Sequence, residues 1–191
     1  MEIRVSSQFL FDKEMFRNGL NDDNVEDTNK AYISIIGTPE CLKYYLDEED
    51  TNHYFEDHPN VLNLDFDDIG YDVIYDGHHF RTMDMEQAER SVDFIERMID
   101  KGVECMVIHC RAGMSRSRGF AEFIYRYCIE NDIDVDYPEQ SYYTTLYNIE
   151  VVKRLNHAYW KKHGVMGYED PETDYPDDIV NTKVVTININ E

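Results

Sequence analysis

The segment 61–130 alternates short apolar runs with amphipathic helical patterns, and this alternation constrains the fold more than any other feature. The apolar run at 61–66 and the one at 103–109 are typical of buried strands. A helix is predicted over 85–101 between them, and a second over 116–130. Strand, helix and strand in this order predict a right-handed βαβ crossover that joins parallel strands. The expected fold class is therefore α/β.

The first of these helices carries signals at both ends. Asp84 can cap its N-terminus, with Gln87 completing a capping box, and Gly102 supplies the C-terminal stop. Apolar residues recur on one face of each helix. In the first helix they are Met85, Ala88, Val92, Ile95 and Ile99; in the second they are Phe120, Phe123, Ile124 and Tyr127.

The remaining elements are predicted from shorter patterns. Brief strands are expected at Ile3 to Val5 and Ile33 to Ile36, and a helical turn at Leu42 to Leu46. A last long helix is supported by apolar residues at helical spacing, namely Leu146, Ile149, Val152, Leu155 and Tyr159. We expect one domain over 1–165, followed by an acidic extension over 166–191 in which "KVVTINI" reads as an edge strand or a tail.

Composition restricts the partners of the chain. Its 191 residues hold 18 Lys and Arg against 40 Asp and Glu, a formal net charge of -22. Such a chain is expected to bind neither nucleic acid nor an anionic membrane nonspecifically, so any anion must be captured by a local site. No apolar run approaches the ~20 residues that span a bilayer.

The cysteines indicate a reducing compartment. Cys41, Cys105, Cys110 and Cys128 show no paired spacing, and the N-terminus does not resemble a signal peptide. We therefore expect free thiols and a cytoplasmic location. Adjacent His78 and His79 point apart on an extended chain, so neither a metal site nor a cofactor is expected.

The loop between the second apolar run and the second helix concentrates chemistry. It reads "HCRAGMSRS" from His109 to Ser117, and it follows a strand of the predicted parallel sheet, at the edge where α/β proteins bind ligands. The backbone N–H groups of its central residues, with a helix N-terminus behind them, can cradle a phosphate. Those residues are Arg111, Ala112, Gly113, Met114, Ser115 and Arg116.

The side chains of the loop point to nucleophilic catalysis. A helix N-terminus and a nearby arginine lower the pKa of a thiol such as Cys110, and a thiolate facing a bound phosphorus is a nucleophile. The guanidinium of Arg116 can grip two phosphate oxygens, and Ser117 can donate a hydrogen bond to the thiolate. His109 points the other way along the strand, so we interpret it as an orienting or pKa-tuning residue.

The conjunction of these residues resembles the H-C-x5-R-[ST] signature of cysteine-dependent protein tyrosine and dual-specificity phosphatases. Residues 30–160 look like the small dual-specificity type, which implies a parallel-dominated, twisted central sheet flanked by helices. The resemblance implies a phosphocysteine on Cys110, phosphate binding by Arg116 and assistance to hydrolysis by Ser117. The expected substrate is a phosphorylated protein, with phosphotyrosine as the default and phosphoserine or phosphothreonine as alternatives.

Such phosphatases also need an aspartic acid over the pocket as general acid. "LDFDDIGYD" offers several, and we expect Asp68 first and Asp67 second, because both follow the strand at its carboxyl end. The acid then lies farther from the cysteine than in the usual family pattern, so residues 70–84 look like an insertion. Other candidates remain open, namely Asp65, Asp72, Asp76 and Asp84.

Other interpretations of the loop remain. A module that binds phosphate without catalysis would need the same cradle, and relatives accept phosphoinositides or RNA 5′-phosphates. Rhodanese or arsenate-reductase chemistry also places a cysteine in an anion loop, although the arginine six positions on fits phosphate better. Cys41 is a candidate partner for a reversible disulfide with Cys110, whereas Asn148 and Arg154 are candidate supports of the loop.

Overall fold

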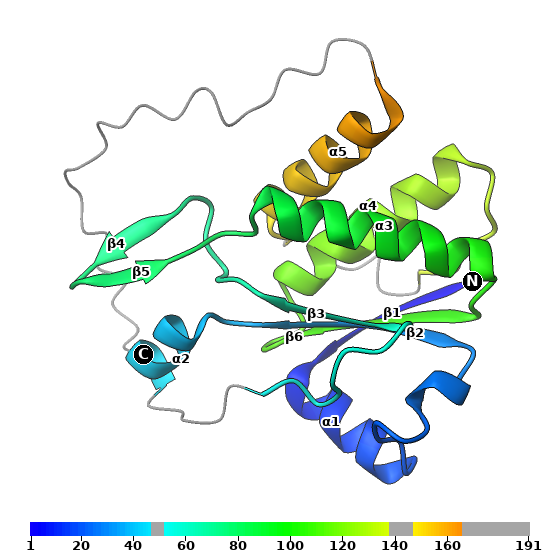
Figure 1. Cartoon of the computed structure of the whole chain (residues 1–191), viewed down its shortest axis with the longest axis horizontal. Helices are drawn as coiled ribbons and strands as arrows, with labels where there is room; N and C mark the ends of the chain where they lie inside the picture. The colour runs from blue at the N-terminus through cyan, green and yellow to red at the C-terminus, as the bar shows by residue number, and fades with distance from the viewer. Residues whose placement is uncertain (47–51, 138–146, 166–191) are drawn as a thin grey trace, which may run out of the picture.

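The computed structural model describes residues 1–46, 52–137 and 147–165, and within them the chain is an α/β protein (Figure 1). Its helices and strands follow one another in this order: β1 Glu2–Ser7, α1 Gln8–Arg17, a short 3-10 helix Val25–Asp27, β2 Lys30–Ile36, α2 Pro39–Leu46, β3 Val61–Asp65, β4 Val73–Tyr75, β5 His78–Phe80, α3 Met85–Lys101, β6 Cys105–Cys110, α4 Arg116–Glu130 and α5 Ile149–His163.

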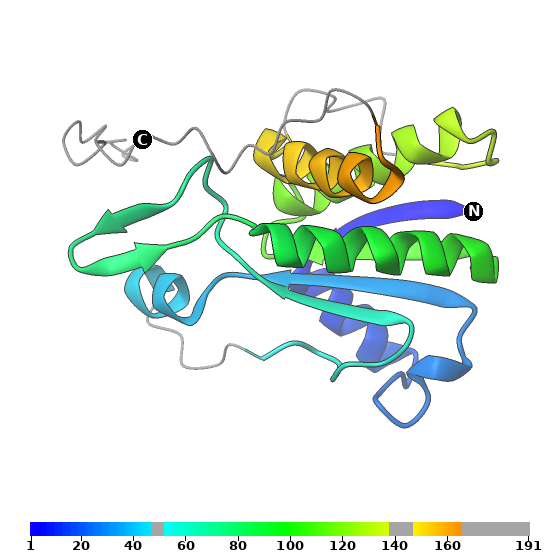
Figure 2. The same ribbon diagram turned by 45° about the horizontal axis from the view of Figure 1, so that its top comes forward.

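A parallel sheet of four strands forms the centre of the fold, in the order β1-β6-β2-β3. The strands predicted to flank the βαβ helix, β3 and β6, are parallel, but β2 lies between them. Helices α3, α4 and α5 cover one face of the sheet, and α1 covers the other (Figures 1 and 2). All four carboxyl ends lie at one edge, which positions the loops that follow β2, β3 and β6 side by side.

Each face of the sheet has its own core, because side chains alternate along a strand. The larger core includes Ile33, Ile35 and Ile108 from the strands and the inner faces of α3 and α4. The smaller core packs Phe11 and Met15 of α1 against the opposite side of β2 and β6. Helix α1 therefore buries only the face that bears these two residues.

The strongest local predictions are confirmed. Helix α3 has the predicted bounds, and Asp84 and Gln87 form the capping box. Gly102 ends the helix with a left-handed φ of 74°. Helix α4 also has the predicted bounds, so the loop between Cys110 and Arg116 lies where the sequence places it.

Other boundaries differ. β6 begins at Cys105 rather than at residue 103. α5 begins at Ile149, and the side chain of this residue is exposed in the first turn instead of lying on the apolar face of the helix. Leu146 and the extension at 166–191, including its predicted strand, lie outside the described residues. Within the described ranges, no helix has the length and apolar character needed to cross a membrane.

The expected insertion contains an element that the sequence analysis missed. β4 and β5 form an antiparallel hairpin that projects beyond the sheet beside α2 (Figure 1). Its turn is Asp76-Gly77, and both residues have positive φ, 50° and 78°. Asp-Gly between two short runs is the usual signal for this turn, and it was present in the sequence.

Candidate active site

The loop that joins β6 to α4 packs tightly against the end of β1. Ser7 is the register partner of Cys110, and the backbone N–H of Gln8 donates to the carbonyl of Arg111 at 3.3 Å. Gly113 has a φ of +69°, and a Cβ there would lie 2.5 Å from the carbonyl carbon of Ser6. Glycine is therefore required at this position by close approach as well as by backbone conformation.

The carbonyls of the loop are turned outward. Those of Arg111, Gly113 and Ser115 accept hydrogen bonds from Gln8, from the Arg118 side chain and from two backbone N–H groups after the loop. In a trans peptide the carbonyl of one residue is opposed to the N–H of the next. The N–H groups that follow these carbonyls therefore point away from the partners of the carbonyls, as backbone binding of an anion by this loop would require.

The Cys110 thiol lies at the base of this loop. It is buried, and its Sγ lies 3.1 Å from the hydroxyl oxygen of Ser117, which is also buried. Burial alone would raise the pKa of Cys110, but the hydroxyl and N–H of Ser117, the charge of Arg116 and the N–H of Ser115 lower it further than burial raises it. The surroundings of this thiol thus favour the thiolate.

Arg116 is held at the edge of the sheet. Its Nη1 donates to the carbonyl of Ile36, at the end of β2, at 2.9 Å and to that of Phe66, just after β3, at 2.6 Å. Its Nε is buried and has no hydrogen-bond partner among the described residues. A buried donor without a partner is costly, so this edge of the guanidinium is suited to an anion.

Asp68 is the aspartate that contacts the loop. Its Oδ1 accepts hydrogen bonds from the Ser115 hydroxyl at 2.7 Å and from Asn148 Nδ2 at 2.9 Å. The carboxylate is exposed, so it is accessible to a bound substrate. The aspartate favoured by the sequence analysis therefore lies beside the loop that holds Cys110.

Asp67 points into the protein instead. Its carboxylate accepts hydrogen bonds from the N–H and hydroxyl of Thr38 and from the N–H of Arg81, all between 2.9 and 3.1 Å. It is buried, and it ties the end of β3 to the start of α2 and to the hairpin. These contacts give Asp67 a structural role.

The other candidate aspartates also have local partners or places in turns. The carboxylate of Asp65 lies 2.9 Å from a ring nitrogen of His53. Asp72 accepts hydrogen bonds from the N–H and hydroxyl of Thr82. Asp76 is in the hairpin turn, and Asp84 caps α3. Among these candidates, Asp68 is the one whose carboxylate accepts a hydrogen bond from a side chain of the loop between Cys110 and Arg116 in the described part of the chain.

His109 lies on the face of the sheet opposite to Cys110. Its ring stacks on Phe11 of α1, with centroids 4.1 Å apart, and neither ring nitrogen has a partner among the described residues. Burial, with smaller contributions from His53 and Arg116, lowers the pKa of His109 to about 3. The imidazole is therefore neutral and packs beneath the loop, as its predicted orientation requires.

Asn148 is a site residue that the sequence analysis left undecided. Its Oδ1 caps α5 by accepting from the N–H groups of Glu150 and Val151, and its Nδ2 donates to Asp68. Its own N–H donates to the carbonyl of Ser115. Asparagine before a helix signals a cap in any sequence, but the contact with Asp68 bridges 80 positions and has no local signal. Arg154 pairs with Glu150 on α5.

Cys41 lies in α2 with its thiol beside Asp67. Burial, together with the charge of Asp67 and a hydrogen bond to it, raises the pKa of Cys41 to about 11. All four cysteines are free in the structure.

No protein-family model matches the chain, and a comparison with curated proteins finds no match.

Proposed function

We propose that this chain is a phosphomonoester hydrolase that acts through a phosphocysteine on Cys110, with phosphorylated protein as its substrate. The observation that carries the proposal is the convergence of three groups on one loop: a thiol whose pKa is lowered, a buried guanidinium edge without a partner, and an exposed carboxyl. Each of the three is what phosphoryl transfer requires.

In the first step, the Cys110 thiolate attacks phosphorus and the bond from phosphorus to the substrate oxygen breaks. The protonated carboxyl of Asp68 gives its proton to that oxygen, which leaves as an alcohol or a phenol. The loop N–H groups and the Nε edge of Arg116 bind the oxygens of the transferring phosphoryl group, where negative charge is concentrated in the transition state.

In the second step, water attacks the phosphocysteine and the bond from sulfur to phosphorus breaks. Asp68, now a carboxylate, accepts a proton from the water, which returns it to its starting state. The Ser117 hydroxyl lies 3.1 Å from Sγ, so it can donate to the departing thiolate. Phosphate and the free enzyme result.

The proposal is tested by hydrolysis of p-nitrophenyl phosphate in the presence of EDTA. We expect activity in the unmodified chain and its loss in Cys110→Ser. Arg116→Lys keeps the charge but not the planar fork, and we expect it to lower kcat/KM by about 10³-fold. A matched control is Cys128→Ser, which changes a buried cysteine of α4 away from the loop.

Two results would contradict the proposal. Hydrolysis that survives in Cys110→Ser would place the chemistry elsewhere. A chain that binds phosphate or vanadate but hydrolyses neither p-nitrophenyl phosphate nor a phosphotyrosyl peptide would be a binding module.

A further inference from the structure

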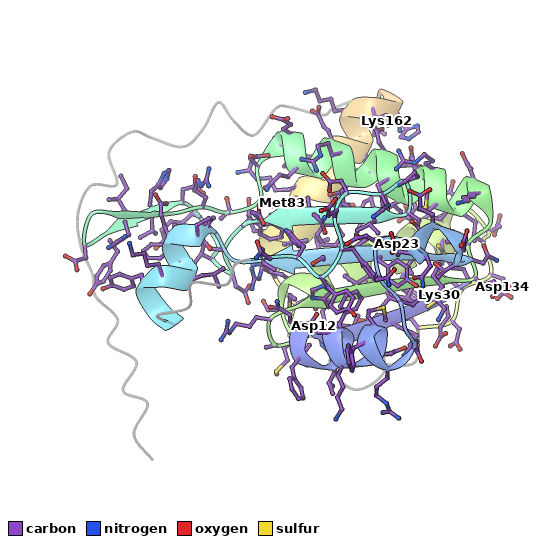
Figure 3. All side chains as sticks on the ribbon, turned by 60° about the horizontal axis from the view of Figure 1, so that its bottom comes forward. Asp12, Asp23, Lys30, Met83, Asp134 and Lys162 are labelled. Atoms are coloured by element: carbon purple, nitrogen blue, oxygen red, sulfur yellow. The ribbon has the colours of Figure 1, made fainter. Side chains whose placement is uncertain are left out.

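Helix α1 is apolar on both of its faces. Phe11 and Met15 are buried in the smaller core, yet the outward face bears Phe9, Leu10 and Phe16, whose side chains are 71%, 56% and 79% exposed. Figure 3 turns this helix toward the viewer, with side chains extending away from the sheet. An amphipathic helix would carry polar residues there, so this face is one that a partner can cover.

The exposed face begins at the candidate active site. Residue Ser7, just before α1, pairs with Cys110, and the N–H of Gln8 donates to the loop carbonyl of Arg111. Phe9 and Leu10 follow directly. Within the loop itself, Met114 is 51% exposed. Apolar side chains thus lie on the loop and on the helix that adjoins it.

The same face is positively charged in a chain whose formal net charge is -22. Its exposed residues are Phe9, Leu10, Lys13, Phe16 and Arg17, which include two cations, and the two acids of the helix, Asp12 and Glu14, are partly buried on its flanks. Glu14, on the flank of the helix, is paired with Arg4 at 3.1 Å. The Lys13 ammonium lies 5.8 Å from the centre of the Phe9 ring. A ligand that fits this face is therefore both apolar and acidic.

We infer that the outward face of α1 is a docking surface for the substrate polypeptide, next to the residue whose phosphate enters the loop. The inference rests on the proposed function and deepens it by naming the substrate class. Phe9 and Phe16 are seven residues apart, or about 10 Å along a helix, which an extended peptide spans in about three residues. The surface therefore selects phosphopeptides with apolar side chains a few residues from the phosphorylated one and with acidic residues between them.

Single-stranded nucleic acid with a 5′-phosphate also uses aromatic and cationic side chains. It fits this surface less well, because Leu10 and Met114 offer no ring on which a base can stack. The negative net charge of the chain also repels a polyanion, and the two cations of the helix can neutralise only about two of its phosphates.

The test compares two synthetic phosphotyrosyl peptides of equal length with the full chain. One carries leucine three and six positions from the phosphotyrosine on both sides, with aspartate between; the other carries serine at all of these positions. We expect kcat/KM to favour the first peptide about tenfold or more. In the double variant Phe9→Ala, Phe16→Ala this preference is expected to disappear.

Hydrolysis of p-nitrophenyl phosphate separates the two levels of the proposal. This substrate carries no polypeptide that could lie along α1, so its kcat/KM should stay unchanged in the double variant. An unmodified chain that does not hydrolyse p-nitrophenyl phosphate would contradict the proposed function itself. Equal rates for the two peptides, with p-nitrophenyl phosphate still hydrolysed, would overturn only the docking surface.

A matched control is Ile129→Ala, which removes another apolar side chain, 55% exposed, near the end of α4. It should leave the peptide preference intact. Two further results would overturn the inference: an oligonucleotide 5′-phosphate whose hydrolysis exceeds that of both peptides and falls in the double variant, or a dimer in sedimentation velocity that the double variant dissociates.

Discussion

The region around Cys110 and the region around Cys41 both lie within the field of Arg116, yet they set opposite ionisation states for their thiols. Cys110 is surrounded by donors, from the Ser117 hydroxyl and from backbone N–H groups at the start of α4. Cys41 lies beside an acceptor, the buried carboxylate of Asp67. The pKa is lowered at Cys110 and raised to about 11 at Cys41. Burial raises the pKa of both thiols, so a neighbouring positive charge does not by itself activate a thiol. The donors around Cys110 outweigh burial, whereas the charge of Asp67 and a hydrogen bond to it add to burial at Cys41.

The adjacent aspartates repeat this difference. Asp68 contacts the loop of Cys110 through Ser115, whereas Asp67 is enclosed by Thr38 and Arg81 in the region of Cys41. The two adjacent side chains point to different sides of the chain, so one acid contacts the loop and the other braces the fold. Substitutions in the two regions should therefore have distinct consequences.

The largest expected effect separates the two cysteines. Cys110→Ser should lower kcat/KM for p-nitrophenyl phosphate by about 10⁴-fold or more, because a hydroxyl in the same place is a far weaker nucleophile. Cys41→Ser should leave the rate within about twofold, since serine can still donate to Asp67. An equal loss of kcat/KM in both variants would contradict the assignment of Cys110 alone as the nucleophile.

Cys110 and Cys41 should also differ in their rates of alkylation by iodoacetamide. The thiolate is the reactive form, so the rate at Cys110 should level off at a lower pH than that of an ordinary cysteine, whereas the rate at Cys41 should still rise toward pH 11. Near neutral pH we expect Cys110 to react about 10²-fold faster, as measured by mass spectrometry of its peptides. Inorganic phosphate should protect Cys110 alone. Equal rates near neutral pH would show that the donors do not lower the pKa of Cys110.

Substitution of Asp68 should affect catalysis, whereas substitution of Asp67 should affect stability. Asp68→Asn should lower kcat by about 10²-fold and remove the alkaline limb of the pH profile, because the amide cannot give a proton. Asp67→Asn should instead reduce the free energy of unfolding by about 1–3 kcal/mol, since the amide presents donors to donors. Denaturant unfolding and steady-state kinetics measure the two effects. Loss of the alkaline limb in Asp67→Asn would exchange the two assignments.

A smaller effect is expected from Asn148→Asp. The variant keeps an oxygen to cap α5 but places a second carboxylate against Asp68, which raises the pKa of the pair. We expect kcat to fall by about tenfold and the alkaline limb to move to higher pH, while the melting temperature changes little. Asn148→Ala, which removes the cap as well, is the matched comparison. An unmoved limb in Asn148→Asp would show that Asn148 supports only the helix.

How much of this was predictable depends on the range over which each signal acts. Helix α3 and helix α4 followed from caps and periodicity, and Cys110, Arg116 and Ser117 from one continuous motif. Asp68 was selected only by its place after a strand. Its contacts with Ser115 and Asn148 join β3, the loop and α5, and no local pattern encodes such distant pairs.

The unpredicted parts have specific causes. The order of the strands, with β2 between β3 and β6, is a choice of topology that periodicity does not record. The β4–β5 hairpin was missed because its strands are only three residues long each, although Asp76-Gly77 marked the turn. The exposed apolar face of α1 was hidden because both faces of that helix are apolar, and only packing reveals which one is buried.

A phosphocysteine on Cys110 can be observed directly by trapping the phosphoenzyme. Ser117→Ala removes the donor to the departing sulfur and should slow hydrolysis of the intermediate more than its formation. After acid quench of a reaction with p-nitrophenyl phosphate, we predict one phosphoryl group on the peptide that contains Cys110, absent in Cys110→Ser. Phosphate released with no phosphoryl group on that peptide, or a phosphoryl group on another residue, would contradict a phosphocysteine intermediate on Cys110.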